Sequence, residues 1–209
     1  MSTLWRWFRI WAVLKLIAGP IYLFVIRPWG MRWGATDEEI DRPMPGDEIL
    51  PDRNYDTTKA ITIDAPPEAV LPWLVQLGKG RGGLYSIDWL DRLFGFLDAP
   101  SAQEILPQYQ ELHAGDAIPT SPIDWPVQFV DPGRALVLGD RIGEGGWSWA
   151  FGLYPMPDGR TRLVSRNRAR TPGGVAWWLG MLVIDAAALV MTRQMLINLR
   201  DRAERLARA

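Results

Sequence analysis

The C-terminal part of the chain has the clearest pattern of apolar and polar positions. From about Met181 to Arg208, apolar residues recur at spacings of three and four, and neither Pro nor Gly follows Gly180. This periodicity predicts one long helix with a buried face and a solvated face. At ~1.5 Å per residue the helix is about 42 Å long, enough to cross a small domain. The predicted buried stripe consists of Leu182, Asp185, Leu189, Thr192, Leu196, Leu199, Ala203 and Leu206.

Upstream of this helix, a strand pattern is followed by two short helical patterns. Residues 57–63 alternate like a half-buried strand, with isoleucines on one face. A helix is predicted from Pro67 to Leu77, with a kink or restart at Pro72, because proline cannot donate the helical hydrogen bond. A second short helix is predicted over roughly Ser86–Phe96.

The region between these helices and the C-terminal helix predicts several short antiparallel strands. Asp131-Pro132-Gly133 and Pro157-Asp158-Gly159 have the composition of tight turns, so they predict two hairpins. An antiparallel sheet with one apolar face, closed by one long helix, is an α+β architecture. The strands are expected at Ala117–Ile118, Val127–Val130, Ala135–Leu138, Trp147–Tyr154 and Thr161–Ala169.

The last two predicted strands each have two distinct faces. Trp147, Trp149 and Phe151 share one face of the first, where they are expected to form a cavity wall. On the second strand, Arg166, Arg168 and Arg170 share a face, which we expect to be solvated. Contact of these arginines with an anionic ligand or anionic lipid is the alternative.

The first thirty residues are dense in aromatic and aliphatic side chains. As a helix, Trp5–Ile26 would be about 33 Å long, close to the thickness of a bilayer core. Early basic residues and Pro20 interrupt it, and no signal-peptide cleavage pattern follows. We predict a membrane-associated helix that either spans the bilayer briefly or lies at its interface, on an undetermined side. A helix packed on the folded body is the alternative.

The remaining organisation follows from charge. Residues 31–55 are rich in acids and contain Pro43, Pro45, Gly46 and Pro51, so they predict an irregular acidic connector. The chain is therefore divided into a hydrophobic helix (1–30), a connector (31–55) and a folded domain (56–209). The net charge of −1 does not indicate a nucleic-acid partner.

Composition excludes several kinds of chemistry. Without cysteine the chain has no disulfides, thiolate metal sites or cysteine nucleophiles, and its single histidine, His113, excludes multi-histidine metal sites. Residues 78–83 satisfy the GxGxxG pattern, but they follow a predicted helix rather than a strand, so we expect no dinucleotide. A flexible loop at the cavity mouth is the expectation instead. No cofactor and no metal are predicted.

A resemblance to a known superfamily is carried by the runs 33–39, 60–70, 80–90, 191–196 and 202–205. The chain resembles the SRPBCC superfamily, the START-like helix-grip group of pollen-allergen carriers, lipid-transfer domains and polyketide cyclases, and in particular an uncharacterised bacterial branch of it. The resemblance covers about residues 33–206 and implies a curved sheet gripping the C-terminal helix around an apolar cavity. It transfers no catalytic residue, because the superfamily shares none.

Two sets of residues are candidates for the polar contacts of such a cavity. Tyr85 and Trp89 are four residues apart and could share a helix face beside Asp88, although core aromatics and a helix-dipole acid are the ordinary interpretation. Asp185 lies on the apolar stripe with Leu189 and Thr192. There it requires an arginine partner, a raised pKa or access to water, unless it faces solvent near the helix start. Entry of 172–192 into a membrane is a further alternative.

The sequence therefore predicts a membrane-associated helix-grip protein that binds or transports a hydrophobic small molecule, such as a lipid or a polyketide-like compound. The alternative is a cyclase-like or hydrolase-like enzyme that uses Tyr85, Asp88 or Asp185 as acid or base. A third possibility is an interaction module with a filled core and no ligand.

Overall fold

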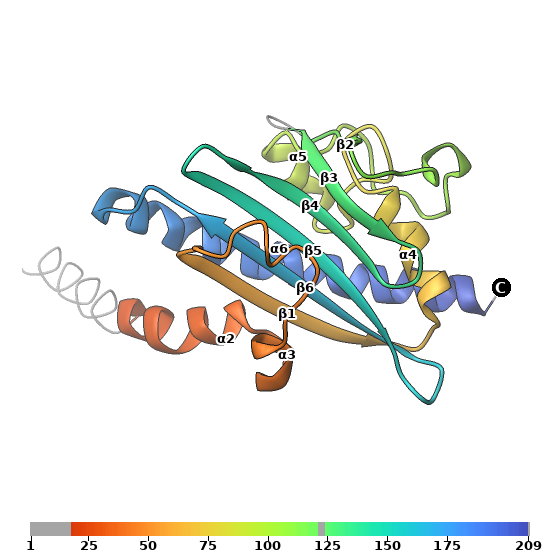
Figure 1. Ribbon diagram of the computed structural model, residues 1–209, viewed down its shortest axis with the longest axis horizontal. Helices are drawn as coiled ribbons and strands as arrows, with labels where there is room; N and C mark the ends of the chain where they lie inside the picture. Colours follow the sequence, from red (N-terminus) through yellow and green to blue (C-terminus); the bar gives the residue numbers. More distant parts are fainter. Residues whose placement is uncertain (1–17, 121–123, 209) are drawn as a thin grey trace, which may run out of the picture.

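The chain folds as a curved antiparallel sheet laid along one long helix (Figure 1). The computed structural model describes residues 18–120 and 124–208. The sheet order is β1-β6-β5-β4-β3-β2, and every neighbouring pair is antiparallel. The α+β helix-grip prediction is thereby confirmed. The strands are β1 Tyr55–Ile63, β2 Ala117–Ile118, β3 Trp125–Asp131, β4 Ala135–Ile142, β5 Gly145–Pro155 and β6 Thr161–Arg170.

The predicted turns join the strands as expected. Gly133 and Gly159 have φ of 77° and 84°, a conformation that glycine adopts without strain, and they close the β3–β4 and β5–β6 hairpins. Helix α4 (Pro67–Val75) continues through Pro72, so the predicted restart is absent. Helix α5 (Asp88–Leu93) is shorter than predicted, and a 3₁₀ turn, η2, spans Pro107–Tyr109.

The long helix, α6, begins earlier than the sequence predicts. It runs from Val175 to Ala207 and passes through Gly180, because an isolated glycine weakens a helix by about 1 kcal/mol without breaking it. Its second half is a core helix: Leu196, Leu199 and Ala203 are fully buried with α4 and the concave face of the sheet. Among the described residues, α6 is the one helix whose length and composition could cross a membrane.

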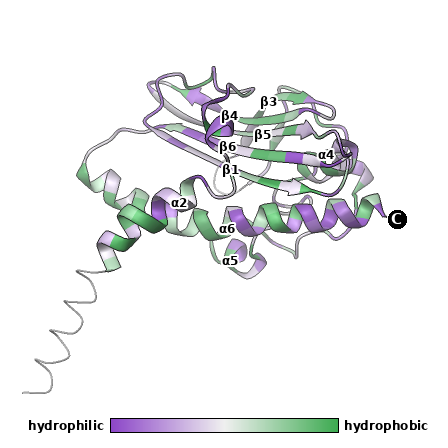
Figure 2. Cartoon of the chain, turned by 90° about the horizontal axis from the view of Figure 1, so that it is seen from below, coloured by the Kyte–Doolittle hydropathy of each residue, from purple (hydrophilic) through white to green (hydrophobic). Residues whose placement is uncertain are grey.

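A short helical segment precedes the domain and runs beside the first half of α6. It comprises η1 (Tyr22–Ile26) and α2 (Arg27–Met31). The Tyr22 hydroxyl donates to the carbonyl of Leu182 at 2.7 Å, and a Cβ on Gly30 would overlap the Leu189 side chain. The two helices run in the same direction, as Figure 2 shows from another side. Residues 1–17 of the predicted membrane helix lie outside the described residues.

The predicted connector is part of the folded domain. It contains a helix, α3 (Asp37–Asp41), which begins with a capping box between Thr36 and Glu39. The prediction of irregular structure missed this helix, whose start signal is the Thr-x-x-Glu spacing. The segment lies across the convex face of the sheet, opposite α6 (Figure 1).

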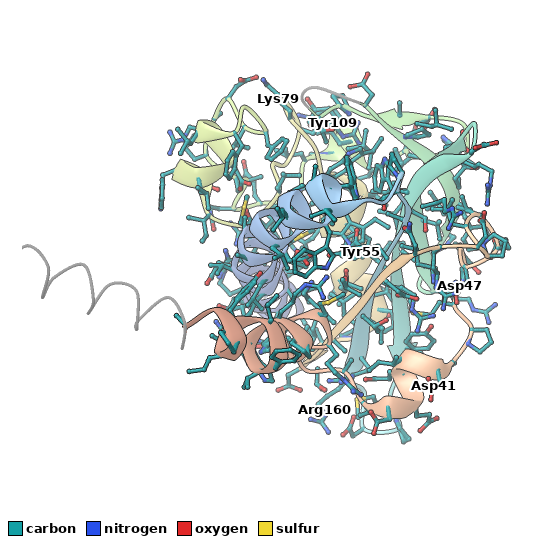
Figure 3. The ribbon with its side chains drawn as sticks, turned by 90° about the vertical axis from the view of Figure 1, so that its left-hand side faces the viewer. Asp41, Asp47, Tyr55, Lys79, Tyr109 and Arg160 are labelled. Carbon is teal, nitrogen blue, oxygen red and sulfur yellow. The ribbon has the colours of Figure 1, made fainter. Side chains whose placement is uncertain are left out.

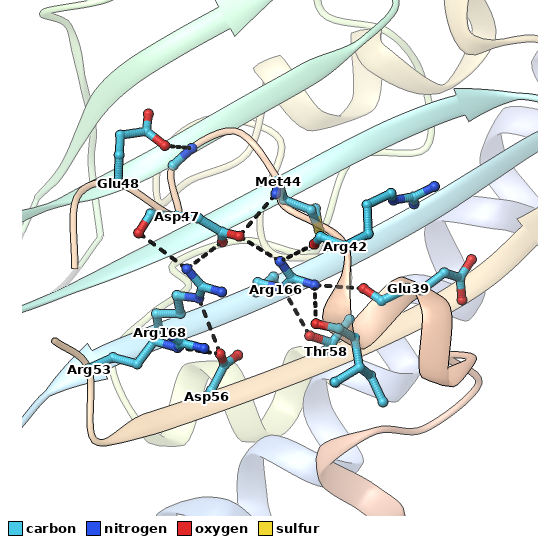
Figure 4. A network of polar contacts seen from close by, with 12 residues as sticks. Glu39, Arg42, Met44, Asp47, Glu48, Arg53, Asp56, Thr58, Arg166 and Arg168 are labelled. Carbon is cyan, nitrogen blue, oxygen red and sulfur yellow. Dashed lines mark hydrogen bonds and ion pairs between the residues drawn. The ribbon is translucent and has the colours of Figure 1, made fainter. Parts of the chain in front are cut away.

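This covering corrects the prediction that the β6 arginines are solvated. Arg166 is 1% exposed and Arg168 is 8% exposed, because the acidic segment lies over them. Asp47 accepts from Arg166 at 2.8 Å and from Arg168 at 2.9 Å, as Figure 4 shows. The acidic residues of this segment therefore neutralise the outer face of β6, and only Arg170 of the three remains largely accessible.

Candidate functional site

A cavity lies between the concave face of the sheet and the first half of α6. Its larger part, which we name the apolar lobe, has a volume of about 390 Å³. Phe94 and Ile184 line it while being 49% and 54% exposed, so the lobe reaches the surface. The apolar lobe is lined by Leu84, Ser86, Asp91, Phe94, Phe96, Trp125, Trp149, Ile184, Ala187, Ala188, Met191, Thr192 and Met195.

A second part, which we name the polar lobe, has a volume of about 330 Å³ and shares a wall with the first. Trp125, Trp149, Ile184, Ala188 and Thr192 line both lobes. Ligand cavities commonly measure 300–1,000 Å³, so either lobe is large enough for a small molecule. The residues that line the polar lobe but not the apolar lobe are Tyr55, Thr57, Lys59, Trp147, Asn167 and Met181.

The aromatic wall comes from β3 and β5. Trp125 meets Trp147 and Trp149 edge to face, with ring centroids 5.5 and 5.3 Å apart. The indole N–H of Trp149 donates to the Ser165 hydroxyl at 2.8 Å, which satisfies its polar atom and fixes the ring. Phe151 also stacks on Trp149, but it lies deeper, fully buried in the core beyond both lobes.

Asp185 has the arginine partner that the sequence analysis named as one of its options. Its carboxylate is 5% exposed and accepts from Arg27 Nε at 2.6 Å and from the Tyr55 hydroxyl at 2.6 Å. Burial, followed by the hydrogen bond to Asp185, raises the pKa of Tyr55 far above its ordinary value. Figure 3 shows Tyr55 between β1 and α6. These three side chains therefore join α2, β1 and α6 beside the cavity. A hollow of about 10 Å³ next to the polar lobe is lined by Asp185 together with Tyr55, Thr57 and Lys59.

Lys59, which the sequence analysis missed, is the charged group inside the polar lobe. It is 4% exposed, and no hydrogen bond or ion pair holds its ammonium group within the described chain. Burial lowers the pKa of Lys59 from 10.5 to about 8, while Asp185 acts in the opposite direction. The alternation of β1 contained the signal, because Lys59 falls on the same face as Ile61 and Ile63.

Asp91 is a second missed residue, at the edge of the apolar lobe. It is fully buried, and the Ser86 hydroxyl donates to one of its oxygens at 2.6 Å. The other oxygen, Oδ1, has no hydrogen-bond partner among residues 18–120 and 124–208. Burial raises the pKa of Asp91, with the nearby Asp88 acting in the same direction. The spacing from Tyr85 and Trp89 predicts Asp88 as the acid of the cavity. Because α5 begins at Asp88, however, Asp91 is the acid that faces inward.

The structure places the predicted Tyr85, Asp88 and Trp89 group outside the cavity. Tyr85 precedes α5 with φ of 56°, so it does not share a helix face with Trp89. It is buried in the core, where its hydroxyl accepts from the Gln76 side-chain amide at 2.8 Å. Asp88 accepts from the backbone N–H and hydroxyl of Ser101. Trp89 is 65% exposed, because α5 turns Asp91 inward instead.

The remaining candidates also have structural roles. The loop at 78–83 closes on itself through paired backbone hydrogen bonds between Gly78 and Gly83, and Arg81 donates to the carbonyls of Leu77 and Val75. The loop is therefore tied down rather than free to act as a flexible gate. His113 is exposed beside Asp116. Over residues 18–120 and 124–208, no group of three or more His, Asp or Glu side chains is placed to hold a metal.

Neither a family model nor a curated protein matches the sequence. Solved structures do match. Protein MLL2253 from Mesorhizobium loti is 16% identical with a TM-score of 0.44, covering 72% of this chain and 98% of that one. The Zhui aromatase/cyclase from a Streptomyces species is 18% identical (TM-score 0.41; 74% and 96% covered), and Aha1 from Colwellia psychrerythraea is 14% identical (0.41; 72% and 96%). Because their TM-scores are all below 0.5, these matches carry no argument about ligand or activity.

Proposed function

We propose that this protein binds a hydrophobic small molecule in the cavity between α6 and the sheet, and carries it at or near a membrane. The observation that carries the proposal is the apolar lobe of about 390 Å³, walled by Trp125, Trp149 and Met191. Burial of apolar surface is worth about 25 cal/mol per Å², so a ligand that fills this lobe gains several kcal/mol from desolvation alone.

Filling the cavity tests this proposal. Ala188 lines both lobes, so Ala188→Trp places an indole where the ligand would lie. We expect the variant to bind 1-dodecanol at least about tenfold more weakly than the wild type, measured by isothermal titration calorimetry. Ala186→Trp is the matched control, because Ala186 is exposed on the other side of α6. The affinity of this variant for 1-dodecanol is expected to equal that of the wild type. Equal affinity in the wild type and Ala188→Trp would contradict binding in this cavity.

The membrane part of the proposal rests on a second surface, which we name the apolar end. It consists of exposed apolar residues on the two parallel helices that project beyond the sheet (Figure 2). Trp side chains suit the headgroup region of a bilayer, and residues 1–33 carry five basic residues and no acid, which favours anionic lipid. Ile184, at the opening of the apolar lobe, belongs to this surface, which would give a ligand a short path to the bilayer. The apolar end comprises Ile21, Phe24, Val25, Ile26, Trp29, Val175, Trp177, Trp178, Leu179 and Ile184.

Charge placed on the apolar end should release the protein from membranes. We expect the double variant Phe24→Glu, Trp178→Glu to float with phosphatidylglycerol-containing vesicles at least about tenfold less than the wild type, because each carboxylate opposes burial in lipid. Phe129→Glu is the control, since Phe129 is 41% exposed on β3, outside the apolar end. Flotation of the double variant at the wild-type level would refute the assignment of this surface.

An enzyme is the second candidate, and one observation favours it. Burial in the apolar lobe raises the pKa of Asp91, and its Oδ1 has no partner among the described residues, two features that are common in catalytic acids. An enzyme that uses Asp91 would convert its substrate, whereas Asp91→Asn would retain the unconverted substrate. Native mass spectrometry would then find co-purified ligands of different mass in the two proteins. A carrier gives the same ligand mass from both proteins.

A further inference from the structure

The polar lobe contains one charged side chain, Lys59, that has no partner among the described residues. Lys59 projects from β1 among Thr57, Asn167 and Trp147, and the residue as a whole is 4% exposed. Within the described chain its ammonium group has neither a hydrogen-bond acceptor nor an ion-pair partner. A buried ammonium group without a partner is costly, and folded proteins keep such a group where it has a task.

The charged groups around Lys59 leave a positive excess. Asp185 on α6 lines the same small hollow as Lys59, but its carboxylate is already engaged by Arg27 of α2 and by the hydroxyl of Tyr55. Tyr22 of η1 also faces this cluster, and burial raises the pKa of Tyr22, so neither tyrosine supplies a negative charge near neutral pH. The three ionised groups therefore sum to one positive charge, and it lies on the cavity side, at Lys59.

The two lobes together describe the shape of a ligand. The polar lobe offers one cation, the Thr57 hydroxyl and the Asn167 amide, and across the shared tryptophan wall the apolar lobe offers aromatic and aliphatic side chains. We propose that the ligand is an amphiphile with a single carboxylate, held by Lys59 in the polar lobe, and an apolar chain that fills the apolar lobe. This inference rests on the proposed function and specifies its ligand class. A phosphate monoester would bring up to two negative charges against one ammonium group and next to Asp185, so a carboxylate is the better match.

Matched probes of equal chain length separate the headgroup from the chain. We expect wild-type protein to bind dodecanoate at least about tenfold more tightly than 1-dodecanol at pH 7, since a charge-assisted hydrogen bond contributes such a factor. The measurements stay below the micellar concentration of dodecanoate and the solubility limit of dodecanol. Lys59→Met keeps the length and apolar stem of the side chain. In this variant the preference for dodecanoate over dodecanol is expected to vanish. Lys79→Met is the control, because Lys79 pairs with Asp98 at the surface.

Proton linkage gives an independent readout in the wild type. Because the pKa of Lys59 is about 8 in the free protein, dodecanoate affinity should fall about tenfold between pH 7 and pH 9.5, and dodecanol affinity should not change. In spectra of [1-¹³C]dodecanoate, the bound carboxyl signal of the wild type should differ from that of Lys59→Met. Dodecyl phosphate serves as the second headgroup arm and is expected to bind more weakly than dodecanoate.

The outcomes distinguish this inference from the proposed function. If neither dodecanoate nor dodecanol binds to the wild type, the hydrophobic-ligand function fails. If both bind equally, or if Lys59→Met retains the preference for dodecanoate, the cavity binds apolar chains and the carboxylate subsite is wrong. Tighter binding of dodecyl phosphate than of dodecanoate would also overturn the choice of headgroup.

Discussion

Asp47→Asn is expected to lower the free energy of unfolding by about 3 kcal/mol, the loss typical of a buried ion pair deprived of one partner. Asp47 bridges Arg166 and Arg168, which are 1% and 8% exposed. Arg166 also donates to the Thr58 hydroxyl and to the carbonyls of Glu39, Ile40 and Arg42, so it cannot turn outward to water without breaking these bonds. The neutral amide would leave its charge buried with only dipoles around it.

Urea unfolding followed by circular dichroism measures this effect. Asp98→Asn is the matched control, because Asp98 forms an exposed pair with Lys79 and its side chain is 68% accessible. Exposed pairs contribute about 0–1 kcal/mol, so the control is expected to stay within that range of the wild type. If Asp47→Asn loses no more than Asp98→Asn, the acidic segment does not hold the convex face as described.

The local pattern of apolar and polar residues is sufficient to predict the sheet and the long helix. Strand alternation, two Pro/Gly turns and a three-four apolar spacing each depend on residues within about ten positions, which is the range where sequence periodicity is informative. The pattern places the start of α6 too late, because Gly180 resembles a helix boundary. The helix in fact begins at Val175, on the N-terminal side of this glycine. For Asp185, the apolar stripe correctly indicated that a buried acid needs a partner, and Arg27 supplies it.

Contacts between distant segments could not be predicted in this way. Arg166 and Arg168 alternate as residues on a solvated face do, and only the acidic segment, more than a hundred positions away, makes that face buried. The site has the same limitation. Lys59 interrupts an apolar face at one position, and a single lysine in a strand is ordinarily placed at an edge or in solvent. Lys59 is a candidate site residue only because it lines a cavity, and that cavity forms only when α6 packs against the sheet.

Lys59→Met is expected to stabilise the protein, by up to about 3 kcal/mol at pH 7. The reason is the lowered pKa: Lys59 titrates near 8 in the folded protein and near 10.5 when unfolded, and each tenfold difference in proton affinity is worth about 1.36 kcal/mol. Methionine fills the same volume without a charge to desolvate. A site residue that costs this much stability in the unliganded protein is consistent with a charge kept for a ligand.

The sign of the pH dependence is specific. Between pH 8 and about 10.5 the unfolded chain binds more protons than the folded one at this position, so wild-type stability rises with pH relative to the variant. The advantage of Lys59→Met is therefore expected to be complete below pH 8 and to shrink steadily above it, in urea unfolding at pH 7, 8, 9 and 10. Lys79→Met, on the surface, should show no such trend.

If Lys59→Met is less stable than the wild type at pH 7, or if the difference in stability does not change with pH, Lys59 is solvated or paired in solution. The carboxylate subsite would then lose the uncompensated charge on which it depends.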